Sequence, residues 1–149
     1  MPATAVEAPP LPNLAVSNRT GSPPWASIAI ESDIAPLEEA WRAFEQTALV
    51  TPYQAYGWIR AFVETVGAAQ GMSFRYALLR DAAGAPCALL PLAITRRSGF
   101  RFAEIIGGKH ANYHMGLYAP AFAAKFDALL AARMLRESGT AIGGVEARV

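Results

Sequence analysis

The chain contains a single cysteine, Cys87, so it cannot form an intrachain disulfide or a zinc site built on several thiolates. Its charge is nearly balanced, with 13 basic and 12 acidic residues, which excludes an overall field that would attract nucleic acid or an anionic membrane. No run reaches the ~20 apolar residues that span a bilayer, and the amino terminus lacks the features of a secretory signal. These absences predict a cytoplasmic chain without a transmembrane segment or a nucleic-acid partner.

Proline is unevenly distributed, since six of the eleven prolines precede Trp25. They are mixed with Ala, Ser, Asn and Gly without apolar periodicity, and such a segment cannot bury enough surface to offset the entropy lost on folding. We therefore expect residues 1–24 to form a disordered leader. The chain as a whole is 53% hydrophobic over 149 residues, which is enough for one domain with its own core.

Two amphipathic helices are predicted after a short strand at 28–30. Ser32 and Asp33 offer caps for the first helix, and the second follows the Thr51-Pro52 break and is expected to end at Gly67. Each has an apolar face at helical spacing, which predicts that the two helices pack side by side through aromatic residues. The two faces consist of Leu37, Trp41, Phe44 and Ala48, and of Trp58, Ile59, Phe62 and Val66.

From residue 74 the pattern changes to three antiparallel strands, expected at 74–80, 87–97 and 100–106 and joined by tight turns. The second strand contains Pro91, which has no N–H to donate, so a bulge or a local loss of pairing is expected there. A polar loop at 109–113, a short strand at 115–118 and a helix at 122–134 follow. The fold class is therefore α/β of the α+β type, an antiparallel meander flanked by helices.

The last predicted element is a helix with nothing after it, although in an α/β layer a helix normally crosses over to deliver another strand. Residues 139–149 are too weakly patterned to count as a strand. We therefore expect an unstructured tail at 139–149 and a chain that covers only part of its fold, as a truncated reading frame would. The apolar face of the final helix would then be partly uncovered, and the chain is expected to self-associate.

Several motifs occur in a distinctive order: Thr51-Pro52-Tyr53-Gln54 before Trp58 and Phe62, then Ala88-Leu89-Leu90-Pro91-Leu92 before Arg96-Arg97, then Ile105-Ile106-Gly107-Gly108 and Asn112-Tyr113-His114. Their order and spacing resemble the CelD/BcsL-type proteins. These are GNAT-superfamily acetyltransferases associated with cellulose or exopolysaccharide biosynthesis and similar in build to the FemABX aminoacyltransferases. The resemblance covers about residues 30–138, so residues 25–138 are expected to form the amino-terminal half of a GNAT-like acyltransferase.

The resemblance implies transfer of an acyl group from acetyl-CoA or another acyl-CoA to a small-molecule or glycan acceptor. It places the coenzyme site mainly in a later repeat, so no coenzyme is expected to bind this chain alone, and no catalytic residue is assigned. The turn at 96–101 joins two strands and has Arg101 where a phosphate loop needs a small residue. Gly107-Gly108-Lys109 lacks the spacing and the following Ser or Thr of a P-loop.

The candidate substrate-cleft residues are His110, Asn112, Tyr113 and His114, in the polar loop after the third strand. Loops at strand ends often carry binding residues, and histidine can exchange a proton near neutral pH. Two histidines four residues apart also suggest a metal site, but a third ligand is missing and a loop is expected here, so no metal is assigned. A plain solvated loop is the simplest alternative. A non-catalytic module that binds a glycan or a protein is the alternative function.

Overall fold

The structure, a computed structural model, describes residues 21–143 and the backbone of residues 146–148. Residues 1–20 of the predicted leader therefore lie outside the described residues. Its remaining residues, 21–24, form an irregular segment in which the Gly21 carbonyl accepts a hydrogen bond from Arg133 at 3.2 Å. Along the chain the elements are β1 (Ser27–Glu31), η1 (Ala35–Leu37), α1 (Glu38–Glu45), η2 (Pro52–Gln54), α2 (Tyr56–Phe62), η3 (Val63–Gly67), β2 (Ser73–Arg80), β3 (Pro86–Arg97), β4 (Phe100–Ile105), η4 (Gly108–His110), β5 (Leu117–Tyr118), α3 (Pro120–Ala123), α4 (Ala128–Ala141) and β6 (Glu146–Arg148).

The described strands form one sheet in which β1, β2, β3 and β4 pair antiparallel in that order. The short β5 pairs with β3, and β6 pairs with β4 in parallel. The strands predicted at 74–80, 87–97 and 100–106 are β2, β3 and β4, and they form the predicted meander. The prediction of an α+β fold with an antiparallel meander flanked by helices is confirmed.

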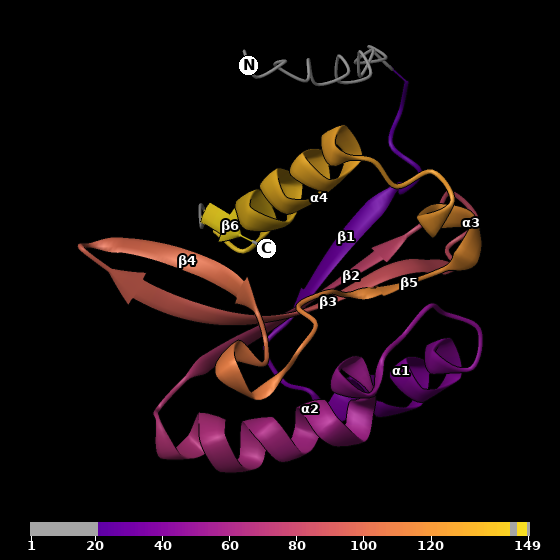
Figure 1. Ribbon diagram of the computed structural model, residues 1–149. Coiled ribbons are helices and arrows are strands. Elements are labelled where there is room, and N and C mark those ends of the chain that lie inside the picture. Colours follow the sequence, from indigo (N-terminus) through magenta and orange to yellow (C-terminus); the bar gives the residue numbers. More distant parts are fainter. Residues whose placement is uncertain (1–20, 144–145, 149) are drawn as a thin grey trace, which may run out of the picture.

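Helices cover both faces of the sheet, as Figure 1 shows: α1 and α2 pack on one face, and α3 and α4 lie on the other. Side chains alternate along β3, so Leu89 and Ala93 contribute to the core under α1 and α2, whereas Leu90 and Leu92 contribute to the core under α4. A strand buried on both faces needs the continuous apolar run that β3 has. No helix within the described residues is long and apolar enough to cross a membrane.

The two tryptophans expected in the core differ in burial. Trp41 of α1 is fully buried, and its Nε1 donates to the Gln54 carbonyl at 3.0 Å. Trp58 of α2 packs against the same core and is partly buried. Its ring stacks on Phe62, with 5.5 Å between centroids, and lies beside Gly107 of the segment after β4.

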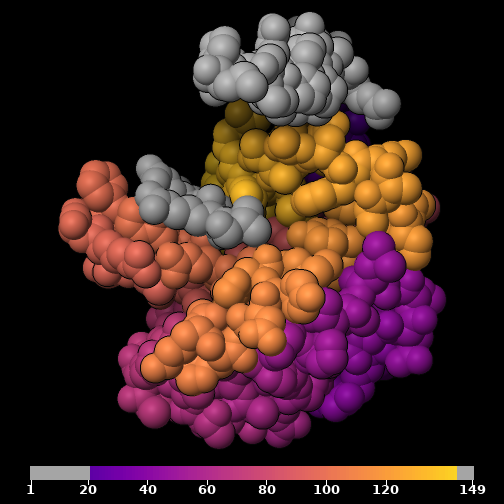
Figure 2. All heavy atoms as spheres, viewed as in Figure 1, coloured from indigo at the N-terminus to yellow at the C-terminus, as the bar shows by residue number. Residues whose placement is uncertain are grey.

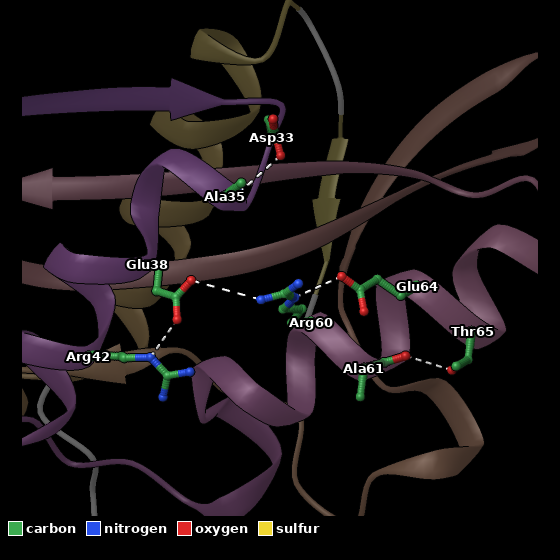
Figure 3. Close-up of polar contacts among 8 residues, drawn as sticks. All are labelled: Asp33, Ala35, Glu38, Arg42, Arg60, Ala61, Glu64 and Thr65. Carbon is green, nitrogen blue, oxygen red and sulfur yellow. Dashed lines mark hydrogen bonds and ion pairs between the residues drawn. The ribbon is translucent and has the colours of Figure 1, made fainter.

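Ion pairs join α1 to α2 on the outside of their layer (Figure 3). Glu38 pairs with Arg42 at 2.9 Å and Arg60 with Glu64 at 2.7 Å, each at the i,i+4 spacing of one helix. Arg60 also reaches Glu38 across the two helices at 3.9 Å. These side chains are 41–58% exposed, so water and salt screen the pairs and their contribution to stability is small. The apolar core, more than the charges, fixes α1 against α2.

The structure changes two details of the predicted helix ends. Asp33 lies just before the first helical turn and its Oδ1 accepts from the Ala35 N–H at 3.0 Å (Figure 3), but the N-cap position is Ile34 and has no side-chain capping bond. Gly67 does not end the second helix, which continues through η3 to residue 69. A Cβ at Gly67 would lie 2.5 Å from the Phe74 ring, so glycine is needed there for packing. The residue that turns the chain is Gly71, with φ of +60°.

The carboxyl-terminal part contains more structure than predicted. The single helix expected at 122–134 is divided into α3 and α4, because Asp127 begins a new helix by accepting from the Leu130 N–H at 2.8 Å. The expected unstructured tail at 139–149 is also wrong for the described residues, since α4 runs to Ala141 and β6 pairs in parallel with β4, Ala147 opposite Ala103. The helix α4 thus crosses over to deliver a strand. The pairing of β6 with β4 could not be predicted from sequence, because β6 has only three residues and β4 is far from it in the chain.

Candidate functional site

The sheet opens on one side of β3 at Pro91. On this side β5 pairs with β3 as far as Leu89, and the pairing with β4 starts at Leu92. The Pro91 carbonyl accepts from the Ile106 N–H at 3.0 Å, so the nitrogen of Pro91, which carries no hydrogen, faces the same side and cannot donate to a strand there. The predicted local loss of pairing therefore occurs here, while the register shift between β2 and β3 lies at 79–80.

An apolar cavity of about 490 Å³ lies at this opening, between the sheet and the α3/α4 side. His114 and Tyr118 are the only polar side chains among its lining residues, and none of them is charged. Leu49 and Phe126 also line the cavity, and both are large apolar residues that are partly exposed to solvent. A cavity of this size with apolar walls and few polar groups is typical of a small-molecule site. The main apolar walls are Leu90, Ile105, Met115, Phe126, Met134 and Leu135.

The segment that follows β4, residues 107–116, forms one edge of the cavity through His114 and Met115. We call it the 107–116 loop. In Figure 2 it crosses the visible face as an orange band between the α1/α2 layer and the α3/α4 side. The loop contains every candidate site residue predicted from the sequence.

Gln54 holds this loop on the α2 side. Its side chain is fully buried, and Nε2 donates to the Tyr113 carbonyl at 3.1 Å. Oε1 accepts from Thr51 twice, from the backbone N–H at 3.1 Å and from the hydroxyl at 2.6 Å, which completes a capping box at the start of η2. Next to it the Tyr53 hydroxyl accepts from Asn112 Nδ2 at 3.2 Å. Two motifs far apart in the sequence, 51–54 and 112–114, therefore meet in space.

Two glycines allow close packing, one within the loop and one against β3. Gly107 has φ of +135°, and a Cβ there would lie 2.5 Å from the Ala111 Cβ. At the other end a Cβ on Gly116 would lie 2.6 Å from both the Leu89 carbonyl oxygen and the Leu90 side chain. A larger residue at Gly116 would push the loop away from β3, and one at Gly107 would disturb the conformation of the loop itself.

The two histidines of the loop have different surroundings. Both are exposed, and the His110 ring packs edge-on against Phe62 of α2, with 5.9 Å between centroids. His114 lines the cavity, and its Nε2 lies 2.8 Å from the Gly108 carbonyl. A carbonyl only accepts, so Nε2 is the donor and, in the neutral ring, Nδ1 is left as an acceptor. No described residue forms a hydrogen bond with Nδ1, so His114 can accept a proton or a hydrogen bond from a ligand in the cavity.

Asn112 and Tyr113 differ in which of their groups are already hydrogen-bonded. The Asn112 amide is used in the contact with Tyr53, and the Tyr113 carbonyl in the contact with Gln54. The Tyr113 ring is free of both contacts and 61% exposed. The structure thus brings the four predicted residues into one loop, but only His114 among them lines the cavity.

Neither the turn at 96–101 nor the amino termini of α3 and α4 have the features of a pyrophosphate site. The turn at 96–101 joins β3 to β4 and opens no helix. The amino terminus of α4 is occupied by the Asp127 carboxylate, which would repel a phosphate, and α3 has only 4 residues. A metal has no better site, since the described residues include no group of three or more His, Cys, Asp or Glu side chains that could hold one.

Sequence reasoning missed most of the residues that form this site. Gln54 was part of a motif but had no assigned role, although the Thr51-x-x-Gln54 spacing is that of a capping box and could have indicated it. Of the cavity residues from α4, Met134 lies in the predicted helix at 122–134 without an assigned role, and Leu135 lies beyond that helix. Cys87 is buried, and burial raises the pKa of its thiol, which disfavours the thiolate that a nucleophile needs.

Comparison with known proteins gives no relative for this chain: no protein-family model, no curated protein and no solved structure matches it.

Proposed function

We propose that this chain is the amino-terminal half of a GNAT-like acyltransferase, and that its cavity holds the acyl part of a thioester or the apolar part of the acceptor. The observation that carries the proposal is the opening of the sheet at Pro91 with an apolar cavity of about 490 Å³ beside it. The resemblance of the sequence to CelD/BcsL-type proteins implies such an opening, since GNAT enzymes bind the acyl thioester in a V-shaped cleft beside a bulged central strand. The cytoplasmic location and the link to polysaccharide synthesis belong to this proposal.

Three features support a binding role for the cavity. Its walls are apolar, so a hydrocarbon chain gains about 0.8 kcal/mol for each methylene that leaves water. The unpartnered Nδ1 of His114 lies at the edge, where it can accept a hydrogen bond from an attacking amine or hydroxyl. Gln54 and the two close-packed glycines fix the edge, and fixed positioning supplies much of the rate in direct transfer reactions.

The coenzyme enters this proposal only as the acyl donor of the full-length protein. Because the turn at 96–101 and the amino termini of α3 and α4 form no pyrophosphate cradle, the proposal assigns the nucleotide part to other residues of the full-length protein. The chain alone then distinguishes ligands by their acyl or apolar part and not by the nucleotide.

The test is the binding of S-hexanoyl-N-acetylcysteamine, a thioester that lacks the nucleotide. Five methyl and methylene carbons gain about 4 kcal/mol if the cavity buries them, and association has its own entropic cost, so the Kd should be about 1 mM or weaker. Ala131 lines the cavity, whereas the neighbouring Ala132 is exposed. Ala131→Trp should abolish binding in equilibrium dialysis and Ala132→Trp should leave it intact. Equal binding by both variants would show that the ligand does not use the cavity.

Glycan binding without catalysis is the second candidate, and the exposed Tyr113 ring favours it, since sugars stack on exposed aromatic faces. Cello-oligosaccharides should then shift the Tyr113 ring resonances, and Tyr113→Ala should abolish the binding. No shift at saturating oligosaccharide would remove this candidate and leave the acyl proposal untouched.

A further inference from the structure

The turn between β3 and β4 carries three arginines and an exposed aromatic residue. We call residues 96–101 the basic tip. Arg96 and Arg97 end β3, Phe100 and Arg101 begin β4, and the Phe100 side chain is 63% exposed. The hairpin projects from the body of the protein, as Figure 1 shows at the label β4 and Figure 2 shows as the salmon lobe. The proposed acyl site does not use this tip.

The charge of the basic tip is only partly neutralised. Arg97 pairs with Glu104 at 3.5 Å. Arg96 and Arg101 lie directly opposite each other across the two strands, and in the described residues neither has an ion-pair partner. Like charges in this position destabilise a hairpin, so the tip has an unbalanced positive charge that an anion would relieve. The net charge of the whole chain is only +1, so this local excess stands out.

The backbone holds the tip in a fixed shape. Ser98 and Gly99 have φ of +50° and +83°, the signs that a two-residue type I′ turn requires. This turn matches the twist of the strands, and it keeps Arg97 opposite Phe100 at the end of the hairpin. Because side chains alternate along a strand, Arg97 and Phe100 lie on one face of the hairpin and Arg96 and Arg101 on the other. Arginines are thus presented on both faces of the narrow tip and the aromatic ring on one, with little ordering left to occur on binding.

We propose that the basic tip docks on a membrane surface that contains anionic lipid, with the arginines on headgroup phosphates and the Phe100 ring in the interface. Arginine binds phosphate through several donors, and an aromatic ring beside cationic residues is typical of interfacial anchors. A membrane is flat and wide, so one projecting tip can reach it. Nucleic acid, by contrast, is bound by a longer track of positive charges than a single turn offers. The chemistry thus favours a lipid surface.

The experiment is sedimentation of the whole chain with phosphatidylcholine vesicles, with and without phosphatidylglycerol, at low and at physiological salt. Binding should need the anionic lipid and weaken with salt. Each arginine near an anionic surface changes the partition coefficient by about fivefold, so Arg96→Gln with Arg101→Gln should lower it by about 25-fold. Phe100→Ser should lower it by about tenfold.

The matched control is Lys125→Gln with Arg136→Gln, which removes the same charge from exposed positions outside the tip. This control should change the partition coefficient by less than about twofold. An equal loss in the control and the tip variant would show nonspecific attraction and overturn the proposal. So would the absence of binding to phosphatidylglycerol vesicles at low salt, or tip-dependent binding to a duplex oligonucleotide at lower concentration than to vesicles. Thermal melting of each variant verifies that the fold is retained.

Discussion

Replacement of Gln54 by leucine tests how the 107–116 loop is held. Gln54 is fully buried between η2 and the loop, and its side chain makes hydrogen bonds to Thr51 and to the Tyr113 carbonyl. Leucine has a similar volume and makes none of them. The variant therefore removes the polar link between the α2 side and the loop without leaving a large cavity.

The magnitude follows from these contacts. The two hydrogen bonds from Thr51 and the one to the Tyr113 carbonyl are worth about 1 kcal/mol each. Thr51 is only partly buried and Tyr113 is exposed, so water can replace some of what is lost. We therefore expect Gln54→Leu to lower the free energy of unfolding by about 2 to 3 kcal/mol, a large part of the ~5 to 15 kcal/mol typical of a domain.

Urea denaturation followed by far-ultraviolet circular dichroism measures this change, and the rate of tryptic cleavage at the exposed Lys109 reports on the loop. Gln54→Glu keeps the acceptor for Thr51 but places an oxygen against the Tyr113 carbonyl, so it should raise cleavage at Lys109 as much as leucine does. Gln46→Leu, at an exposed position after α1, is the control and should change neither quantity. A Gln54→Leu variant within about 0.5 kcal/mol of the parent, with unchanged cleavage, would refute the role given to Gln54.

Four further outcomes are expected. Burial raises the pKa of Cys87, so the native thiol should react with a disulfide reagent far more slowly than the unfolded chain at about pH 8. Burial also raises the pKa of Tyr76 and Tyr118 above the ordinary 10.0, so the unfolded chain loses these protons before the folded chain does. The free energy of unfolding should therefore hold below about pH 10 and fall above it. Urea midpoints measured at about pH 9 and about pH 11 will show this difference. Phe126→Ser with Leu129→Ser, at exposed apolar positions, should reduce self-association measured by light scattering, and a parent that is already monomeric would contradict this. Calorimetric titration with acetyl-CoA should give no measurable binding to this chain, and micromolar affinity would overturn that expectation.

The central sheet was predictable because its signals are local. The strands β2, β3 and β4 are joined by short turns, so the apolar run of β3 and the turn residues determine both pairing and register. Pro91 predicted a break in pairing because a missing N–H has the same effect in any context. The side of β3 on which the break occurs could not be predicted, since it depends on which neighbour faces the proline.

Other features depend on contacts between distant residues. Gly67 follows an apolar helical pattern as a capping glycine does, and only the position of the Phe74 ring shows that it serves packing instead. The division of the last helix depended on whether Asp127 would cap or lie within it, which the apolar pattern does not decide. The strand β6 forms because β4 offers a free edge, and a three-residue strand has no pattern of its own.

The sequence predicted the loop that carries the candidate site, but it did not predict the cavity beside that loop. Its loop was recognisable from polar residues after a strand, and it contains His110, Asn112, Tyr113 and His114. Sequence could not show that His114 alone among them would line the cavity, because this depends on how Gln54 and Gly116 fix the loop.

The most direct test of the acyl-site proposal is a methyl resonance titration with carbon-13-labelled methionine. Met115 and Met134 line the cavity, whereas Met72 packs against the core under α1 and α2. Addition of S-hexanoyl-N-acetylcysteamine should shift the Met115 and Met134 methyl resonances and leave Met72 in place, and hexanoyl-CoA should give the same shifts at the same concentrations. Resonances that do not move up to the solubility limit of the thioester, or a Met72 shift as large as the other two, would contradict the proposal that the cavity beside Pro91 is an acyl-binding site.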